Sequence, residues 1–387
     1  MIKRVKVKTI DTSYHGSGGR ILSVQVKNKS NFETPTRPIS VPEFKAKQFL
    51  AFRGTLNGHL GAEQIDLKGE RFARFLKMNG TVKRVRRTLT RFADLTCCFE
   101  NFPIFDVPAL SPDSDVALKL ILEMQLRIPT LDYISLPPIQ TANENRFEKL
   151  IHNWNKDAEQ YGKGIVPQVY MNEELGIFRK KLKMLSQIAD SGEIQIVNLI
   201  YANPDSYPHQ FVEVWDNREI NAIVNCSGVP RGGKEVANGL YESPAIELQR
   251  YGIDAFTRRT QTPSIAYIQK LQFQKPPSSI EEIQNFQWPI HRGGAILEKN
   301  LWFSLPSKNV ECRCKVCKGK EQEEIRNTYC IDQDGEIVSV GMEKASRLHD
   351  AVTSQREYEV MRSRINSNEM ADYLAEVIKY RNDKLRP

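Results

Sequence analysis

The sequence lacks the features that mark membrane-spanning and secreted proteins. No apolar run approaches the roughly 20 residues that a helix needs to cross a bilayer. The first residues are basic, but no apolar segment follows them, so they do not form a secretory signal. The seven cysteines are an odd number, which argues against a disulfide framework in a long chain. We therefore expect a soluble, cytoplasmic protein with no membrane partner.

Nucleotide-binding signatures and internal repeats are also absent. Neither a G-x-G-x-x-G nor a G-x-x-x-x-G-K-[ST] loop occurs, and the PRGGK at 230–234 has the spacing of neither. No repeat of roughly 20–50 residues and no low-complexity segment is visible. The chain has 387 residues, of which 40% are hydrophobic and 26% charged, an ordinary globular composition. This length allows either one large α/β barrel or two average domains.

Short apolar strands alternate with amphipathic helices along much of the chain. Alternation or apolar runs predict strands, and a helical period predicts helices. The predicted strands lie at 20–27, 131–136, 164–171, 194–202 and 251–257, the predicted helices at 116–128, 143–161 and 173–192, and a helix followed by a strand at 212–228. Repeated strand–helix units indicate a parallel sheet. We favour a (β/α)8 TIM barrel, which typically takes about 250 residues, over a doubly wound sheet.

Positive charge is concentrated in one stretch of the chain. The net charge is +8, and residues 71–91 contain eight basic side chains and no acidic one. A solvated helix face normally interleaves acidic residues, so the stretch predicts a site for a polyanion. The alternative is a basic surface without a specific partner. Arg84, Arg86 and Arg87 are the candidates for contacts with nucleic-acid phosphates.

A cluster of cysteines near the end of the chain indicates metal binding. Cys312, Cys314 and Cys317 form a C-x-C-x-x-C pattern, and His349 opens a helical stripe further on. Three thiolates and one imidazole complete a closed, tetrahedral Zn²⁺ site, which supports folding and leaves no position for activating water. Cys330 is a competing fourth ligand, and His349 is alternatively a capping or core histidine. We predict one structural zinc ion per chain.

The order of these features resembles the tRNA-guanine transglycosylase superfamily. Its members are (β/α)8 barrels with a C-x-C-x-x-C…H zinc site near the C-terminus. The segment RILSVQVKNKSNFETPTRPISVP is similar to the opening hairpin and T-P-x-x-x-P-V segment of that family. GIVPQVY resembles the strand with the V-Q-G glutamine, which implies that Gln168 lies at the base pocket. NCSGVPRGG resembles the G-G-L loop, which implies that Gly228 and Val229 lie against the bound base.

The catalytic motifs of the family are altered here. The D-S-G-G-F-Q motif, whose Asp is the general base, has an imperfect counterpart that starts at Asp94. YGIDAFTRR resembles the G-V-D-M-F-D strand, but Thr257 stands where the family has its nucleophilic Asp. Either Asp254 is the nucleophile, or the nucleophile comes from elsewhere, or the chain is not catalytic. Arg258 and Arg259 follow this strand and are further candidates for phosphate contacts.

The resemblance implies a pentosyltransferase that replaces guanine in a nucleic acid by a free 7-deazaguanine base through a covalent Asp intermediate. Because both Asp motifs depart from those of tRNA-modifying members, the chain looks more like the DNA-modifying branch, the DpdA family, which inserts 7-cyano-7-deazaguanine. The alternatives are a tRNA-guanine transglycosylase and a non-catalytic, zinc-containing nucleic-acid-binding paralogue. The family also implies a homodimer. The expected organisation is a barrel with an N-terminal hairpin at 1–304, a zinc-binding insertion at 305–352 and helices completing the barrel at 353–387.

Overall fold

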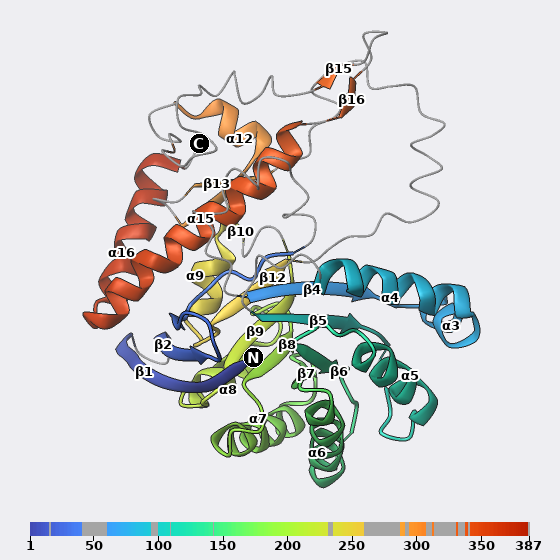
Figure 1. Cartoon of the computed structure of the whole chain (residues 1–387). Helices are drawn as coiled ribbons and strands as arrows, with labels where there is room; N and C mark the ends of the chain where they lie inside the picture. Colours follow the sequence, from blue (N-terminus) through green and yellow to red (C-terminus); the bar gives the residue numbers. More distant parts are fainter. Residues whose placement is uncertain are drawn as a thin grey trace.

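The computed structural model describes most of the chain. The described residues are 1–14, 17–40, 60–93, 100–108, 110–141, 143–230, 235–258, 287–290, 294–306, 312, 330–331, 337–339 and 341–385. They form a mixed α/β fold with a parallel sheet at its centre (Figure 1).

The parallel strands form two groups. Five pair in the order β12-β9-β8-β7-β6, and two others pair as β4-β5. Their bounds are β4 Leu60–Asp66, β5 Glu100–Asp106, β6 Tyr133–Leu136, β7 Gly164–Tyr170, β8 Ile196–Ile200, β9 Ile223–Val229 and β12 Ala255–Arg258. The strands predicted from short apolar runs between 131 and 257 are confirmed, with differences only at their ends. They form because apolar, β-branched side chains fill both faces of a covered parallel sheet.

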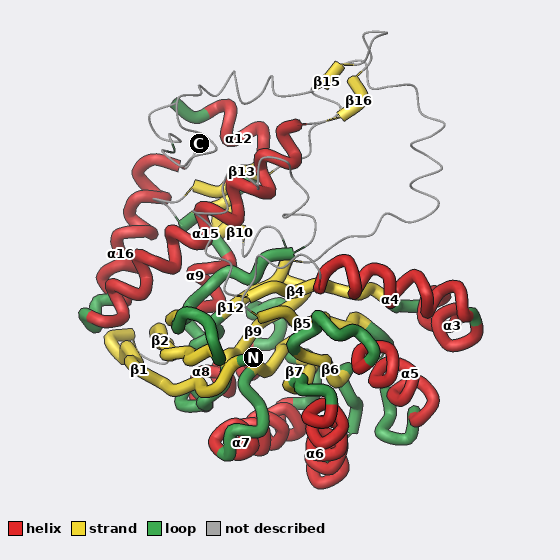
Figure 2. Tube along the Cα trace, viewed as in Figure 1, coloured by secondary structure: helices red, strands yellow, loops and turns green. Residues whose placement is uncertain are grey.

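Helices connect these strands and cover their outer side (Figures 1 and 2). Their bounds are α3 Glu70–Lys77, α4 Asn79–Ala93, α5 Asp115–Leu126, α6 Glu144–Gln160, α7 Leu175–Asp190, α8 Pro208–Asp216 and α9 Pro244–Gln249. The helices predicted between 116 and 216 are confirmed. Asn143 caps α6, because its side chain accepts a hydrogen bond from the backbone N–H of Arg146 at 3.2 Å. None of the described helices combines the length and apolarity needed to cross a membrane.

The segment Thr34–Ile39 lies between the two groups of parallel strands. The backbone N–H of Thr36 donates to the carbonyl of Asp254 at 2.9 Å, just before β12. Ile39 donates to Leu60 and accepts from Ala62 in β4, each at 3.0 Å. Both contacts are parallel bridges. The segment therefore connects β12 to β4.

An antiparallel sheet precedes the parallel strands. It contains β1 Ile2–Tyr14, β2 Ser17–Val26 and β3 Phe32–Glu33, in that order. The pair β1–β2 is the N-terminal hairpin. The segment that resembles the family's opening hairpin starts at Arg20, and within it β2 and β3 pair antiparallel. The buried side chain of Asp11 on β1 accepts a hydrogen bond from the backbone N–H of Met370 at 2.9 Å. This contact caps the start of a C-terminal helix and fixes the hairpin to it.

The C-terminal helices are α15 Gly341–Asn366 and α16 Met370–Tyr380, and a π-helix at Arg381–Leu385 follows them. The expected boundary between 352 and 353 falls inside α15. The remaining described elements are the antiparallel sheet of β10 Glu235–Ala237, β11 Leu240–Glu242, β14 Ala295–Glu298 and β13 Gln287–Ile290, the short helix α12 Lys299–Ser304, and the pair β15 Cys330–Ile331 with β16 Ile337–Ser339.

The hydrophobic core is divided between the two faces of the parallel strands. One cluster lies between the strands and the helices and includes Ile134, Ile165, Val197, Val224 and Phe256. The other cluster lies on the opposite face, which we call the inner face. It combines the N-terminal hairpin with one or two residues from each parallel strand: Leu60, Ala62, Phe102, Ile104, Tyr133, Val166, Ile196, Ile223 and Ala255. Apart from Ile104 on β5, these inner residues stand in the amino halves of their strands.

Candidate functional site

The carboxyl ends of the parallel strands gather polar side chains around two cavities. The larger cavity has a volume of about 870 Å³ and is lined by residues that include Lys68, Tyr170 and Glu173. The smaller has a volume of about 130 Å³, and Lys68, Asp106 and Ser227 are among its lining residues. The carboxyl ends of parallel strands are where α/β folds bind ligands and carry catalytic groups. We therefore take this edge, the carboxyl edge, as the candidate site.

Two carboxylates end neighbouring strands at the carboxyl edge. Asp66 at the end of β4 and Asp106 at the end of β5 stand opposite each other in the parallel ladder. Neighbouring strands lie about 4.8 Å apart, so the two carboxylates project side by side. Lys68 forms an ion pair with Asp106 at 2.8 Å, and Gln64 donates to the same carboxylate at 3.2 Å. Arg71 holds Asp66 at 2.8 Å. The edge thus offers two adjacent carboxylates that cations orient.

Tyr170 ends β7 next to these carboxylates. Its hydroxyl donates a hydrogen bond to the carbonyl of Val107 at 2.7 Å. Burial, followed by the charges of Asp106 and Glu173, raises the pKa of Tyr170 to about 12. Tyr170 is therefore a neutral phenol in the wall of the larger cavity.

A buried pair of opposite charges supports the same wall. Lys181 on α7 donates to both carboxylate oxygens of Glu173 at 2.7 Å and to the carbonyl of Ile139 at 2.7 Å. Burial raises the pKa of Glu173 and lowers the pKa of Lys181, while their mutual attraction opposes both shifts. The pair anchors the start of α7 below the cavity.

A layer of buried amide and hydroxyl side chains lies on the inner face, one level below the carboxyl edge. Gln168, Asn198 and Asn225 stand in register on β7, β8 and β9, and Ser227 and Thr257 complete what we call the amide layer. Each of the five is at most 2% exposed. The inner face therefore changes from apolar side chains at the amino ends to polar side chains toward the carboxyl ends.

Hydrogen bonds connect the amide layer in one direction. Thr257 donates to Asn225 at 3.4 Å, and Asn225 donates to Asn198 at 2.6 Å. Asn198 donates to Gln168 Oε1 at 3.3 Å and to Ser227 Oγ at 2.9 Å. Ser227 also lines the smaller cavity, so the layer reaches the carboxyl edge.

One donor of the amide layer is left over. The Nε2 of Gln168 is buried and has no hydrogen-bond partner among the described residues. A buried donor without a partner costs about 1–3 kcal/mol, so its presence indicates a ligand or water that accepts from it. The structure thus places Gln168, predicted at the base pocket, on the inner face, two residues before Tyr170 on β7. The described lining of the two cavities does not include Gln168.

Gly228 and Val229 are consecutive residues with different surroundings. Gly228 has a φ of +75°, which favours glycine, and it lines the smaller cavity beside Ser227. The ladder between β9 and β12 shifts register here, and Arg258 pairs with Val229. The fully buried Val229 belongs to the cluster under the helices. Of the two residues, Gly228 lines a cavity and Val229 belongs to the core.

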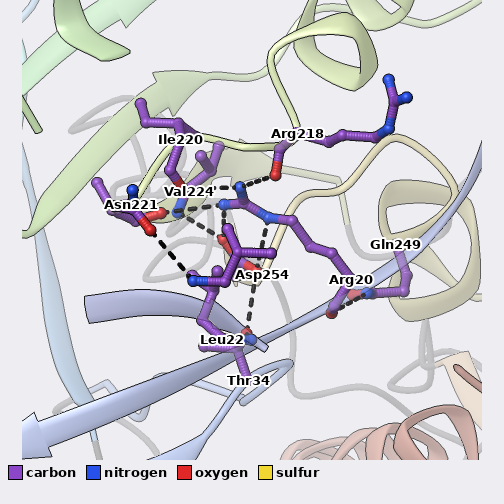
Figure 3. A network of polar contacts seen from close by, with 11 residues as sticks. Arg20, Leu22, Thr34, Arg218, Ile220, Asn221, Val224, Gln249 and Asp254 are labelled. Carbon is purple, nitrogen blue, oxygen red and sulfur yellow. Dashed lines mark hydrogen bonds and ion pairs between the residues drawn. The ribbon is translucent and has the colours of Figure 1, made fainter. Parts of the chain in front are cut away.

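Asp254, the predicted nucleophile, lies at the opposite end of the strands. It precedes β12 and is fully buried, and Figure 3 shows how Arg20 and Thr34 point toward it. Its Oδ1 accepts from Arg20 Nε at 3.1 Å and from Thr34 at 3.0 Å. Its Oδ2 accepts from Arg20 Nη2 and from the backbone N–H of Val224, the latter at 2.8 Å.

Both carboxylate oxygens of Asp254 therefore accept hydrogen bonds from residues that hold the fold together. Burial raises the pKa of the Asp254 carboxyl, and Arg20 and the hydrogen bonds from Val224 and Thr34 counteract this. Arg20 also donates to the carbonyls of Arg218 and Ile220 before β9, at 2.7 and 3.0 Å. The geometry favours a structural role for Asp254, as a connection between the hairpin, the segment after it and two parallel strands.

Arg258, a predicted phosphate ligand, is held by a carboxylate of the chain itself. Its Nε and Nη2 contact Asp350 on α15 at 3.1 and 2.6 Å, a bidentate pair. It also donates to the carbonyl of Pro230 at 2.8 Å and lies over the ring of Phe256. Its side chain is 14% exposed. This arrangement docks α15 onto the carboxyl end of β12.

The predicted phosphate ligands Arg84, Arg86 and Arg87 lie on α4 and are exposed. None of them forms an ion pair with another described residue, whereas Arg71 and Arg74 nearby pair with Asp66 and Glu70. Like charges three or four residues apart on a helix repel one another. A polyanion bound along α4 would relieve this repulsion.

Two of the four predicted zinc ligands lie among the described residues. Cys312 is half-buried, and His349 is fully buried on α15 next to Asp350. Cys314 and Cys317 lie outside the described residues, as do Asp94 and Arg259. The described part of the chain contains no group of three metal-binding side chains. The zinc site stays a prediction from the sequence.

Sequence reasoning missed most of the residues at the carboxyl edge. Asp66, Asp106 and Tyr170 each end a parallel strand, and Asn198 and Asn225 each occupy the middle of one. A signal was present, because a polar residue that ends or interrupts an apolar strand is costly to bury without a purpose. It had no motif attached to it, and the pairing of the strands was needed to bring these residues together.

Comparisons with known proteins leave the family open. No protein-family profile matches the chain, and no curated protein sequence matches it. Among solved structures, a chain of the tryptophan synthase complex from Pyrococcus furiosus is similar with a TM-score of 0.36 and 11% identity. The similarity covers 58% of this chain and 87% of that one. At this TM-score the similarity defines neither a fold family nor a function.

Proposed function

We propose that the parallel strands and the segment Thr34–Ile39 form a (β/α)8 barrel. The bridges from this segment to β12 and β4 support it, as does the shared inner cluster. Between β5 and β6, Asn101 and Asp132 exchange hydrogen bonds at 3.0 Å, and Ser135 donates to the carbonyl of Pro103. In this barrel the amide layer fills the interior and the carboxyl edge is its mouth.

We propose that this mouth exchanges a purine base in a nucleic acid, guanine for a 7-deazaguanine base such as 7-cyano-7-deazaguanine. The observation that carries the proposal is the buried Nε2 of Gln168 on β7, which has no partner among the described residues. A planar base with a carbonyl acceptor fits such a donor. Asp66 and Asp106 stand opposite each other at the carboxyl ends of β4 and β5. The proposal agrees with the sequence resemblance to guanine transglycosylases, and the target nucleotide would be extruded from its stack to enter.

Two adjacent carboxylates suit base exchange with retention at the sugar carbon. In the proposed reaction a carboxylate oxygen of Asp106 attacks the anomeric carbon as the bond from that carbon to the guanine nitrogen breaks. The bond electrons stay on the guanine nitrogen, which takes a proton from solvent, because Asp66 starts as a carboxylate paired with Arg71. The incoming base then loses a proton to Asp66, and its nitrogen displaces Asp106 from the sugar. Asp66 later returns to solvent the proton that it accepts from the incoming base. This assignment replaces Asp254 by Asp106 as the covalent nucleophile.

The proposed partner is DNA, held along α4. Exposed Arg84, Arg86 and Arg87 carry no ion pair with another described residue, which suits contacts to phosphates that fix position without reading sequence. The preference for DNA over tRNA rests on the sequence resemblance. In the proposed protein, Cys312, Cys314, Cys317 and His349 hold one zinc ion that supports folding.

The proposal is tested by incubating the whole chain with DNA or tRNA labelled in guanine, with and without a free 7-deazaguanine base. Base-dependent release of label from DNA is the expected result. Release from tRNA alone would replace DNA by tRNA as the substrate. Absence of release from both, together with retained binding of nucleic acid, would overturn base exchange.

A non-catalytic, nucleic-acid-binding protein is the second candidate. Thr257 stands at the family's nucleophile position, and Asp254 is fully engaged with Arg20, Thr34 and Val224. Both observations favour a chain that has lost the family's chemistry. The same labelling experiment separates the two candidates, since this one predicts binding without release.

A further inference from the structure

The hydrogen bonds that connect Thr257 to Gln168 in the amide layer run in one direction from donor to acceptor. Every hydrogen bond along Thr257, Asn225, Asn198 and Gln168 is donated toward Gln168. Thr257 starts this series with its hydroxyl. Asn225 receives at its oxygen and donates from its nitrogen, and Asn198 repeats this arrangement one strand further on.

Asn198 determines which end of the Gln168 amide is free. Its Nδ2 donates to Gln168 Oε1 at 3.3 Å and to Ser227 Oγ at 2.9 Å. Its Oδ1 is already occupied by Asn225 at 2.6 Å. An amide has one oxygen and one nitrogen, so Gln168 can accept from Asn198 only by turning its own Nε2 away from it.

We propose that Asn198 is a positioning residue that makes the interior of this site a hydrogen-bond donor, and so selects bases with a carbonyl over bases with an amino group at the position facing Gln168. This inference rests on the proposed function, because it concerns the base bound at the same site. The inference adds a residue that determines specificity and that lies on β8, the strand next to that of Gln168. Asn198 contacts Gln168 and acts through it.

The physical basis is the cost of a mismatched donor. A base carbonyl accepts from Gln168 Nε2 and satisfies it. An amino group at the same place brings two donors together and leaves both unsatisfied, at about 1–3 kcal/mol for a buried group. Gln168 cannot relieve this by rotating its amide by half a turn, because its Nε2 would then face the Nδ2 of Asn198. The direction of the hydrogen bonds in the amide layer thus maintains the preference for a base carbonyl over an amino group.

The test compares the equilibrium binding of two free bases to the whole chain. Guanine and 2,6-diaminopurine have nearly the same shape. Guanine carries a carbonyl at C6 and a proton on N1, whereas 2,6-diaminopurine carries an amino group at C6 and no proton on N1. We expect guanine to bind at least about tenfold more tightly. Equal binding, or no binding of either base, would overturn the inference.

Two variants test the role of Asn198. Asn198→Leu frees the amide of Gln168 to rotate, so the preference should fall to near onefold. Asn198→Asp supplies only acceptors, so Gln168 should turn its Nε2 toward Asp and the preference should shift to 2,6-diaminopurine. Asn155→Leu is the control, because Asn155 is a buried amide on α6 that hydrogen-bonds Glu159 far from the layer. It should keep the wild-type preference.

The outcomes separate the inference from the proposed function. If Asn198→Leu folds and retains the preference for guanine, Asn198 does not position Gln168, even if label is released from DNA. If the preference and its loss are both observed while no label is released, the amide layer selects a base and base exchange fails. Thermal unfolding of both variants establishes that they are folded, and either variant alone decides the role of Asn198.

Discussion

Arg20 on β2 and Asp254 before β12 form a fully buried ion pair across 234 residues of sequence. The pair joins the N-terminal hairpin to the amino ends of the parallel strands, on the side away from both cavities. Arg20 adds a hydrogen bond to the carbonyl of Ala222 at 3.0 Å. It therefore ties the start of β9 and the start of β12 to the hairpin.

Removing the cation of this pair should strongly destabilise the protein. Arg20→Met leaves the Asp254 carboxylate buried without a counter-charge, which costs about 3–5 kcal/mol. Denaturant unfolding of the variant measures this loss. Arg127→Met is the control, because Arg127 is exposed at the end of α5 and should change the free energy of unfolding by less than about 0.5 kcal/mol. Equal losses in the two variants would contradict a structural role for the pair.

The sequence predicted local elements well because their signals are local. The apolar run IVNLI and the helical period of residues 175–190 each determine an element whichever partner it packs on. The cap at Asn143 is local in the same sense. The parallel sheet followed from the alternation of these elements along the chain.

The site was less accessible to sequence reasoning because it depends on pairing between strands. Asp254 matched a family motif, yet its role is set by Arg20, and nothing in the local sequence joins the two. Asp66 and Asp106 carry no motif, and their proximity follows only from the register of β4 and β5. Gln168 was found through its motif, whereas its free Nε2 depends on Asn198 one strand away.

Asp106→Asn should abolish base exchange and leave the fold intact. The substitution keeps the shape of the side chain and removes the charge that the proposed attack on the sugar needs. Release of label from guanine-labelled DNA measures the activity, and denaturant unfolding measures the fold. Asp254→Asn is the comparison, because it should lower the free energy of unfolding. If Asp106→Asn exchanges bases normally, the nucleophile is another residue.

Neutralising α4 should weaken nucleic-acid binding in a salt-dependent way. Arg84→Gln, Arg86→Gln and Arg87→Gln together remove three exposed charges. If each contacts a phosphate of duplex DNA, the slope of log affinity against log salt should fall by about 0.9 per contact, or roughly 2.7 in all. Arg127→Gln on α5 serves as the matched control and should leave the slope unchanged. An unchanged slope in the triple variant would place the DNA elsewhere.

Zinc should bind in a ratio of about one ion per chain and depend on the cysteine cluster. Cys314→Ala removes one of the four predicted ligands, so the purified variant should lose zinc together with solubility. Elemental analysis of the protein measures the metal. Cys226→Ala is the control, because Cys226 is buried on β9 and should not affect the zinc content. Full zinc content in Cys314→Ala would exclude Cys314 from the ligand set.

Tyr170 should titrate well above an ordinary tyrosine. Burial and the charges of Asp106 and Glu173 raise its pKa from 10.0 to about 12. The difference in tyrosinate absorbance between wild type and Tyr170→Phe isolates this residue, and its midpoint should lie near 12. Asp106→Asn should lower the midpoint, because Asp106 makes the larger of the two electrostatic contributions to the shift.

The same shift predicts how stability depends on alkaline pH. Between pH 10 and pH 12 the folded state keeps the proton of Tyr170, whereas the unfolded chain releases it. The stabilisation that the raised pKa represents is therefore complete below pH 10 and is lost as the pH rises toward 12. Tyr170→Phe should lack this component of the loss in denaturant unfolding across that range. A midpoint near 10, with parallel stability curves for the two proteins, would contradict both the burial of Tyr170 and its proximity to Asp106 and Glu173.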